Sequence, residues 1–140
     1  MNDVCRMIKK QTVTNFSNME TAIKTYDRNA SVCGTPAWRY VYHAIHSADK
    51  WFFNPSKFTE PDFHENGMDN PDNPCNVVLS DTELLDYLHK VQIKTENYLD
   101  NLSDEELNEK PQGCEYTRLE LILGPVSYTH LRAHETCADL

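Results

Sequence analysis

The chain has 140 residues and a mass of 16.2 kDa, a size typical of one compact domain. With 39% hydrophobic residues, 25% charged residues and only 4 Gly, the composition excludes collagen-like and low-complexity disordered chains. The 13 basic and 22 acidic residues give a net charge of −9, which repels phosphate backbones, so we expect no nucleic-acid partner.

The distribution of apolar residues and cysteines indicates where the protein is located. No run approaches the roughly 18 apolar residues that a membrane span needs, and the polar start MNDVCRMIKK lacks the apolar middle of a secretory signal. The 5 Cys are too irregularly spaced for a disulfide scaffold or a CxxC zinc site. We therefore expect a soluble, cytoplasmic protein with no membrane partner.

The first two predicted elements are amphipathic helices. One runs from Asp3 to Arg28, and the segment NASVCGTP ends it. The other begins at Thr35-Pro36, a capping hydroxyl followed by proline, and ends near Asn54-Pro55. The apolar residues recur at helical steps: Val4, Ile8, Phe16, Met19, Ile23 and Tyr26 in the first helix, and Trp38, Val41, Ile45, Ala48 and Phe52 in the second, widened by Tyr40, Ala44 and Trp51.

A long crossover and a third helix follow. Residues 54–79 are rich in Pro, Asn and Asp, and a crossover of this length lets consecutive helices run in the same direction. A capping box at Ser80 and Glu83 opens the third helix, whose apolar seam is Leu84, Leu88, Val91, Thr95, Tyr98 and Leu102. A second capping box, Ser103 to Glu106, opens a short turn that closes at Lys110-Pro111. A fourth helix begins over residues 116–123, and no segment alternates as a strand does.

The end of the chain has an unusual origin. Val126 to Thr136 reads VSYTHLRAHET, which resembles a translated sequencing adapter. We therefore expect natural protein over residues 1–124 and an adapter-derived, artefactual tail over residues 125–140, with the last helix truncated. His130 and His134, spaced like a ligand pair on one helical face, then carry no biological argument.

His43 and His46 are the first candidates for chemistry, since imidazole is a common metal ligand and titrates near neutral pH. Together with Arg39 and Lys50 they follow four-, three- and four-residue steps, which is typical of a solvated helix face. One helix supplies only two ligands, whereas metals need three or four. Spacing alone favours the solvated face, and it predicts that His64 and His89 are loop or surface histidines.

Cys33 is the strongest thiol candidate. It precedes Gly34 just before a helix amino terminus, where the dipole favours a thiolate. The favoured interpretation is that Cys33 is an ordinary buried or loop thiol. There is no G-x-S-x-G motif and no glycine-rich phosphate loop.

Three segments taken in order, WRYVYHAIHSADKWFF, EPDFHENG and LSDEELN with YTRLELIL, resemble the DinB/YfiT-like family over residues 1–124. The resemblance implies an all-α fold. It implies a four-helix bundle with up-down-down-up topology and a long crossover between its second and third helices.

The resemblance also implies a metal site. The family binds a divalent ion through one histidine of the second helix and two, four residues apart, of the last helix. His43, eight residues before Trp51, matches the first, and His46 is then a neighbour. The pair is replaced here by the adapter-like tail, in which His130 and His134 fall about two residues late, a rotation of roughly 200° on a helix. Asp49 is either a group that orients a ligand imidazole or an exposed helix charge.

The function implied is that of a metal-dependent enzyme, a thiol transferase or hydrolase acting on a small thiol or electrophile, with Zn or Ni as the divalent metal. Three imidazoles leave open positions on the ion where water or a thiolate is activated. As truncated here, the chain is expected to be inactive. The alternative is a non-catalytic helical module that forms a homodimer or binds a partner, in which His43 and His46 are surface or core residues.

Overall fold

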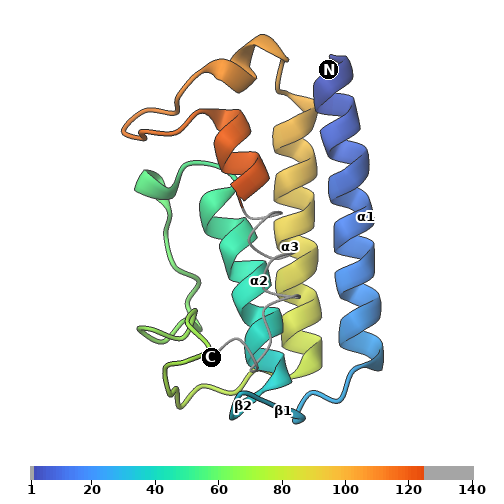
Figure 1. The fold of residues 1–140 in the computed structure, drawn as a ribbon, viewed down its shortest axis with the longest axis vertical. Coiled ribbons are helices and arrows are strands. Elements are labelled where there is room, and N and C mark those ends of the chain that lie inside the picture. Colours follow the sequence, from blue (N-terminus) through green and yellow to red (C-terminus); the bar gives the residue numbers. More distant parts are fainter. Residues whose placement is uncertain (1, 125–140) are drawn as a thin grey trace.

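The computed structural model describes residues 2–124, and the chain there is mostly helical (Figure 1). The elements, in order, are α1 (Asp3–Thr25), β1 (Ser31–Val32), β2 (Thr35–Pro36), α2 (Ala37–Trp51), the 3₁₀ helix η1 (Pro55–Lys57), α3 (Asp81–Asp100) and the 3₁₀ helix η2 (Glu105–Asn108). A further helical stretch covers residues 118–124 and is called the C-terminal segment below. His130 and His134, and the whole tail from residue 125, lie outside the described residues.

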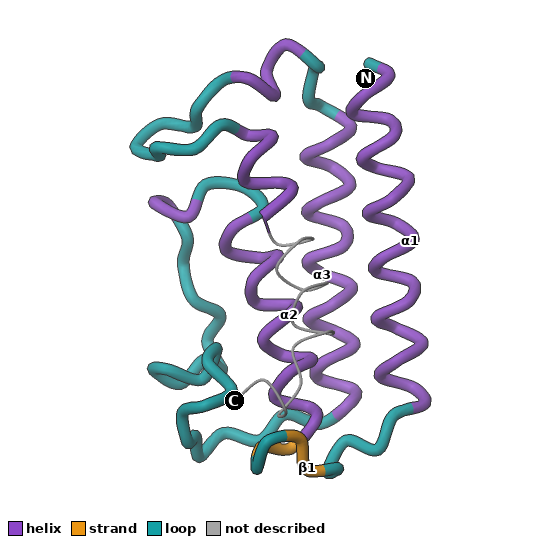
Figure 2. Tube along the Cα trace, in the orientation of Figure 1, coloured by secondary structure: helices purple, strands orange, loops and turns teal. Residues whose placement is uncertain are grey.

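The three long helices lie side by side, and α3 is in the middle (Figure 1). It packs along α1 and along α2, whereas α1 and α2 touch little. After α2 the chain returns along the outer side of that helix before α3 begins, so α2 and α3 run in the same direction and α1 runs against both (Figures 1 and 2). This returning stretch, residues 54–80, is called the crossover below, and its length is what permits the parallel pair.

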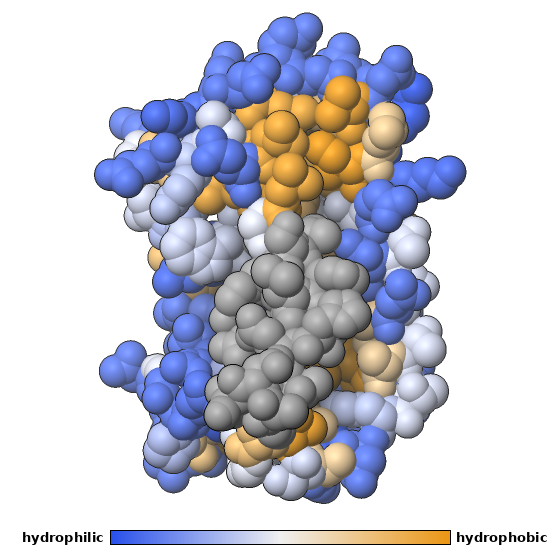
Figure 3. Space-filling model, viewed as in Figure 1, coloured by the Kyte–Doolittle hydropathy of each residue, from blue (hydrophilic) through white to orange (hydrophobic). Residues whose placement is uncertain are grey.

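Two apolar clusters hold the helices together. The larger one centres on α2, α3 and the crossover, and its buried members are Phe16, Ile23, Trp38, Tyr42, Ile45, Met68, Leu79, Leu84, Tyr87, Leu88 and Val91. The smaller one joins the start of α1 to the end of α3 and the C-terminal segment through Cys5, Phe52, Leu99, Leu102, Leu107 and Ile122. On the face drawn in Figure 3, hydrophobic side chains gather at the end of the molecule where α1 begins.

The start of α3 follows the sequence prediction closely. The Ser80 hydroxyl accepts a hydrogen bond from the Glu83 amide at 3.1 Å, and the Glu83 carboxylate accepts one from the Ser80 amide at 3.0 Å. The same reciprocal pair joins Ser103 to Glu106, ahead of η2. Both predicted capping boxes are therefore confirmed.

The segment between α1 and α2 differs from the prediction. α1 ends at Thr25, and a small hairpin of β1 and β2 precedes α2. At its turn Cys33 and Gly34 both have positive φ, 53° and 81°, as a two-residue hairpin turn requires. The predicted cap is wrong: the Thr35 hydroxyl donates to the Pro71 carbonyl in the crossover at 3.0 Å, and Pro36 occupies the capping position without a side-chain bond. Two-residue strands are too short to show alternation in a sequence.

Across residues 2–124, none of the helices combines the length and the apolar character that crossing a lipid bilayer demands.

Candidate functional site

A cavity of about 430 Å³ lies between α2 and the C-terminal segment. Its wall includes His43, His46 and Trp51 from α2, Asp69 from the crossover, and Tyr116 and Glu120 from the last part of the described chain. At the start of the C-terminal segment, the Thr117 hydroxyl donates to the Glu120 carboxylate at 3.1 Å and accepts a hydrogen bond from the Glu120 amide at 3.2 Å. These bonds cap the short helix that forms this side of the cavity. The cavity is large enough for a small molecule.

His43 stands on the cavity wall with a defined ring orientation. Its Nδ1 lies 2.7 Å from the carbonyl oxygen of Asp69. A carbonyl can only accept, so Nδ1 carries a proton, and in the Nδ1–H tautomer the lone pair of the ring is at Nε2. A backbone carbonyl behind the far nitrogen is the usual way of orienting a ligand imidazole.

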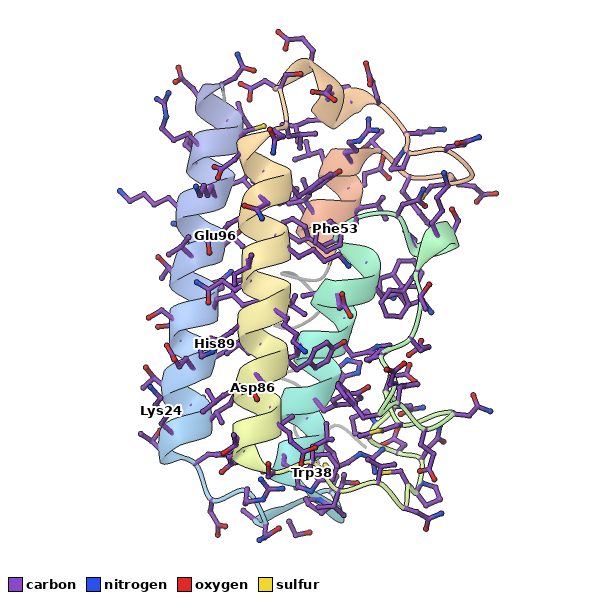
Figure 4. The ribbon with its side chains drawn as sticks, turned by 180° about the vertical axis from the view of Figure 1, so that it is seen from behind. Lys24, Trp38, Phe53, Asp86, His89 and Glu96 are labelled. Carbon is purple, nitrogen blue, oxygen red and sulfur yellow. The ribbon has the colours of Figure 1, made fainter. Side chains whose placement is uncertain are left out.

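Trp51, eight residues further along α2, also lines the cavity. The sequence pattern placed it in the buried stripe, but its side chain is 42% exposed, and the Lys50 ammonium lies 5.4 Å from the ring centroid. Trp38, at the opposite end of α2, is buried beside the hairpin (Figure 4).

The predicted solvated face of α2 is wrong for Arg39 and His46, both of which are buried. The crossover covers this face. One guanidinium nitrogen of Arg39, Nη2, donates to three crossover carbonyls, those of Met68, Asn70 and Asn73, at 3.0 to 3.1 Å. A polar side chain on this helix face therefore binds the carbonyls of the crossover backbone and does not face solvent.

A second group of side chains lies where the crossover meets the middle of α2. The Nε2 atoms of His46 and His64 lie 2.7 Å and 3.1 Å from the same oxygen, Oε2 of Glu60. The two rings stack with centroids 4.7 Å apart and planes inclined by 16°. Their side chains are 3% and 6% exposed, whereas Glu60 is 43% exposed. We call His46, Glu60 and His64 the crossover cluster.

The prediction that His64 is a loop or surface histidine is correct about the loop and wrong about the surface. Burial lowers the pKa of His64, which keeps the ring neutral at pH 7. Its Nδ1 lies 2.6 Å from the hydroxyl of Tyr42, and its Nε2 lies 3.6 Å from a carboxylate oxygen of Asp69. Burial raises the pKa of Tyr42, so this hydroxyl keeps its proton.

Three other candidates have ordinary structural roles. His89 is a surface residue, as predicted, and lies 3.0 Å from Glu20 of α1 (Figure 4). Asp49 neither orients an imidazole nor points to solvent: it accepts from the Tyr87 hydroxyl at 2.7 Å and pairs with Lys94 at 2.9 Å, which ties α2 to α3. Cys33 is exposed at the hairpin turn, and β2 separates it from the start of α2 at Ala37.

Glu60 was not singled out from the sequence. The available signal was the four-residue step from Glu60 to His64, which indicates a shared face only if that segment turns like a helix. Pro61 and the absence of periodicity argued against it. Here a tight turn, closed by the His64 amide on the Pro61 carbonyl at 2.9 Å, brings both side chains to one side.

Comparison with known proteins gives no match: no family model, no curated protein and no solved structure resembles the chain significantly.

Proposed function

We propose that this protein is a four-helix bundle of the DinB type, in which a divalent metal such as Zn²⁺ or Ni²⁺ is held in the cavity beside His43. The activity proposed is that of a metal-dependent transferase or hydrolase acting on a small thiol or electrophile. The parallel course of α2 and α3, the antiparallel α1 and the long crossover support the up-down-down-up topology.

The observation that carries the proposal is the setting of His43. Its Nδ1 is fixed on the Asp69 carbonyl, so Nε2 holds the lone pair that an ion requires, and the residue stands on a cavity wall. The residues present therefore fit a metal through one imidazole. The Glu120 carboxylate lines the same cavity and offers an oxygen as a second donor of suitable chemistry.

A bound divalent ion with an open coordination position supplies acidity to a water or a thiol. The chain supplies the surroundings. Trp51 offers an apolar wall against which a small organic substrate can pack, and the Asp69 carbonyl prevents the His43 ring from turning. With a volume of about 430 Å³, the cavity suits a small substrate.

The test uses the two tryptophans of the full chain as internal reporters. Trp51 lines the cavity, and Trp38 lies 13 residues away on the same helix, about 20 Å along its axis. On addition of paramagnetic Co²⁺ we expect the indole N–H signal of Trp51 to shift or broaden before that of Trp38. In the His64→Ala background, in which the crossover cluster lacks one imidazole, His43→Ala should abolish the effect, and His89→Ala, which removes a surface imidazole, should preserve it.

A small thiol added to the Co²⁺-loaded chain should give a sulfur-to-cobalt charge-transfer band if the ion keeps an open position. If, in the His64→Ala background, the Trp51 signal is insensitive to Co²⁺ or equally sensitive with and without His43→Ala, the metal-dependent enzyme is wrong. The helical module that dimerises or binds a partner is then the better account.

A further inference from the structure

None of the residues of the crossover cluster is a metal ligand in the function proposed above, although His46 also lines the cavity beside His43. It brings together two imidazole nitrogens and one carboxylate oxygen, all within 4.8 Å of one another. We propose that His46, Glu60 and His64 form a separate binding site for one divalent cation of the zinc class, which fastens the crossover to α2.

The geometry favours a cation because two imidazole nitrogens lie close to one carboxylate oxygen. The Nε2 atoms of His46 and His64 lie 2.7 Å and 3.1 Å from Glu60 Oε2. Ligands at about 2.0 to 2.1 Å around a tetrahedral zinc ion stand about 3.3 Å apart, so a retreat of the carboxylate by a few tenths of an ångström makes room. Glu60 has that freedom, since its side chain is 43% exposed.

The choice of ion follows from the donors. Two imidazoles and one carboxylate suit Zn²⁺ and its neighbours, and Mg²⁺ or Ca²⁺ would require more oxygen ligands. A carboxylate oxygen of Asp69 lies 3.6 Å from His64 Nε2, and it or a water can complete the tetrahedron. The exposed Glu60 gives an ion a route from solvent, and the nearly buried rings of His46 and His64 then form the inner side of the site.

The hydrogen-bond partners of the two imidazole rings are also compatible with a bound cation. Without a cation, Nε2–H of His46 donates to Glu60 at 2.7 Å, Nε2 of His64 lies 3.1 Å from the same oxygen, and the Tyr42 hydroxyl donates to Nδ1 of His64 at 2.6 Å. With a cation, the proton of each ring moves to Nδ1, and His64 Nδ1–H donates to the Tyr42 oxygen. The hydroxyl serves in both states because it can accept as well as donate.

The stacking around the cluster keeps the rings in place. The edge of Phe58 meets His46 with centroids 5.4 Å apart, and the Tyr42 ring lies 5.9 Å from that of His64. Phe58 and His64 belong to the crossover, whereas Tyr42 and His46 belong to α2. An ion bound here therefore links the crossover to α2 and should hold the crossover more firmly against that helix.

The first experiment is a Co²⁺ titration of the full chain followed by visible absorption. We expect the intense bands of a tetrahedral ion, at least tenfold weaker affinity in Glu60→Gln and in His64→Ala, and unchanged affinity in Asp62→Asn, which removes an exposed carboxylate of the same loop. His43→Ala should leave these bands in place. Failure of the His43 proposal and failure of this one are thus separately visible.

The second experiment measures the attachment of the loop. Lys57 is the one trypsin site in the crossover and directly precedes Phe58. We expect Zn²⁺ to slow cleavage after Lys57 several-fold in the unmodified chain and in Asp62→Asn, and to have no effect in Glu60→Gln. Circular dichroism of each variant shows whether it has folded.

If the folded chain gives no tetrahedral Co²⁺ spectrum, the cluster is a hydrogen-bonded network only and the site is disproved. If the spectrum persists in both Glu60→Gln and His64→Ala, the ion is bound elsewhere, and the proposal is equally overturned.

Discussion

Arg39 of α2 and Met68 of the crossover are joined by a buried hydrogen bond, from guanidinium Nη2 to carbonyl oxygen, at 3.1 Å. The same nitrogen reaches two further carbonyls of the crossover. Buried carbonyls without a donor are costly, so this one side chain determines how an irregular backbone can lie against a helix.

We therefore expect Arg39→Ala to lower the free energy of unfolding by about 3 kcal/mol, since a charge-assisted contact is lost and three carbonyls are left without this donor. Urea denaturation followed by circular dichroism measures the change. Lys50→Ala, on the same helix, should cost less than about 0.5 kcal/mol. Equal effects of the two substitutions would contradict the role given to Arg39.

The Tyr42 hydroxyl should matter to the metal affinity of the crossover cluster. Tyr42→Phe removes the partner of His64 Nδ1, and loss of such a partner typically weakens metal binding by about 10- to 100-fold. Tyr40→Phe is the matched control, because its hydroxyl donates to the Val32 carbonyl at 3.0 Å, at the surface. The comparison is made by Co²⁺ titration, and similar affinities for the two variants would count against the assignment.

The capping box of α3 gives a stability prediction. Ser80→Ala removes the acceptor for the Glu83 amide and should destabilise the protein by about 1 kcal/mol. Ser17→Ala, at an exposed position inside α1, should be neutral or slightly stabilising because alanine has the higher helix propensity. Thermal melts of both variants are sufficient, and a loss of stability in Ser17→Ala alone would disprove the prediction.

Cys5 should be an unreactive thiol. Burial raises its pKa to about 11, and the nearby Asp104 carboxylate adds to the effect. Alkylation needs the thiolate, so at pH 8 we expect Cys5 to react with iodoacetamide at least about tenfold more slowly than the half-buried Cys114. Peptide mass spectrometry after timed quenching measures both rates, and equal rates in the folded chain would refute the expectation.

The same shift has a consequence for stability. In the unfolded chain the Cys5 thiol ionises at about pH 8.5. Because the folded state holds the proton up to about pH 11, the contribution to stability is complete below pH 8.5 and is lost as the pH rises towards 11. Cys5→Ala should remove this part of the alkaline loss of stability, which urea titrations between pH 8 and pH 11 would detect.

The parts of the fold that depend on local chemistry could be predicted from the sequence. α3 begins after Ser80 because the cap and Glu83 are neighbours in the chain, and its buried residues Leu84, Leu88 and Val91 follow the helical period. The existence of the crossover was predictable for the same reason, since nothing between residues 54 and 79 favours a long helix.

The surroundings of α2 could not be predicted in this way. Whether Arg39 and His46 face water or protein depends on the path of a segment that lies 14 to 34 residues further along the chain, and no local period encodes that path. Polar side chains with buried partners look like a solvated face when only their spacing is known. His64 and Glu60 were hidden for the same reason, because their proximity to His46 results from long-range packing.

Asp69 lies against a histidine of each proposed site. Its carbonyl oxygen orients His43, and its carboxylate lies 3.6 Å from His64. We expect an ion that draws this carboxylate towards the crossover cluster to shift the peptide group that orients His43 as well. Filling one position should alter the affinity of the other, and thermodynamic reciprocity requires the factor to be the same in both directions.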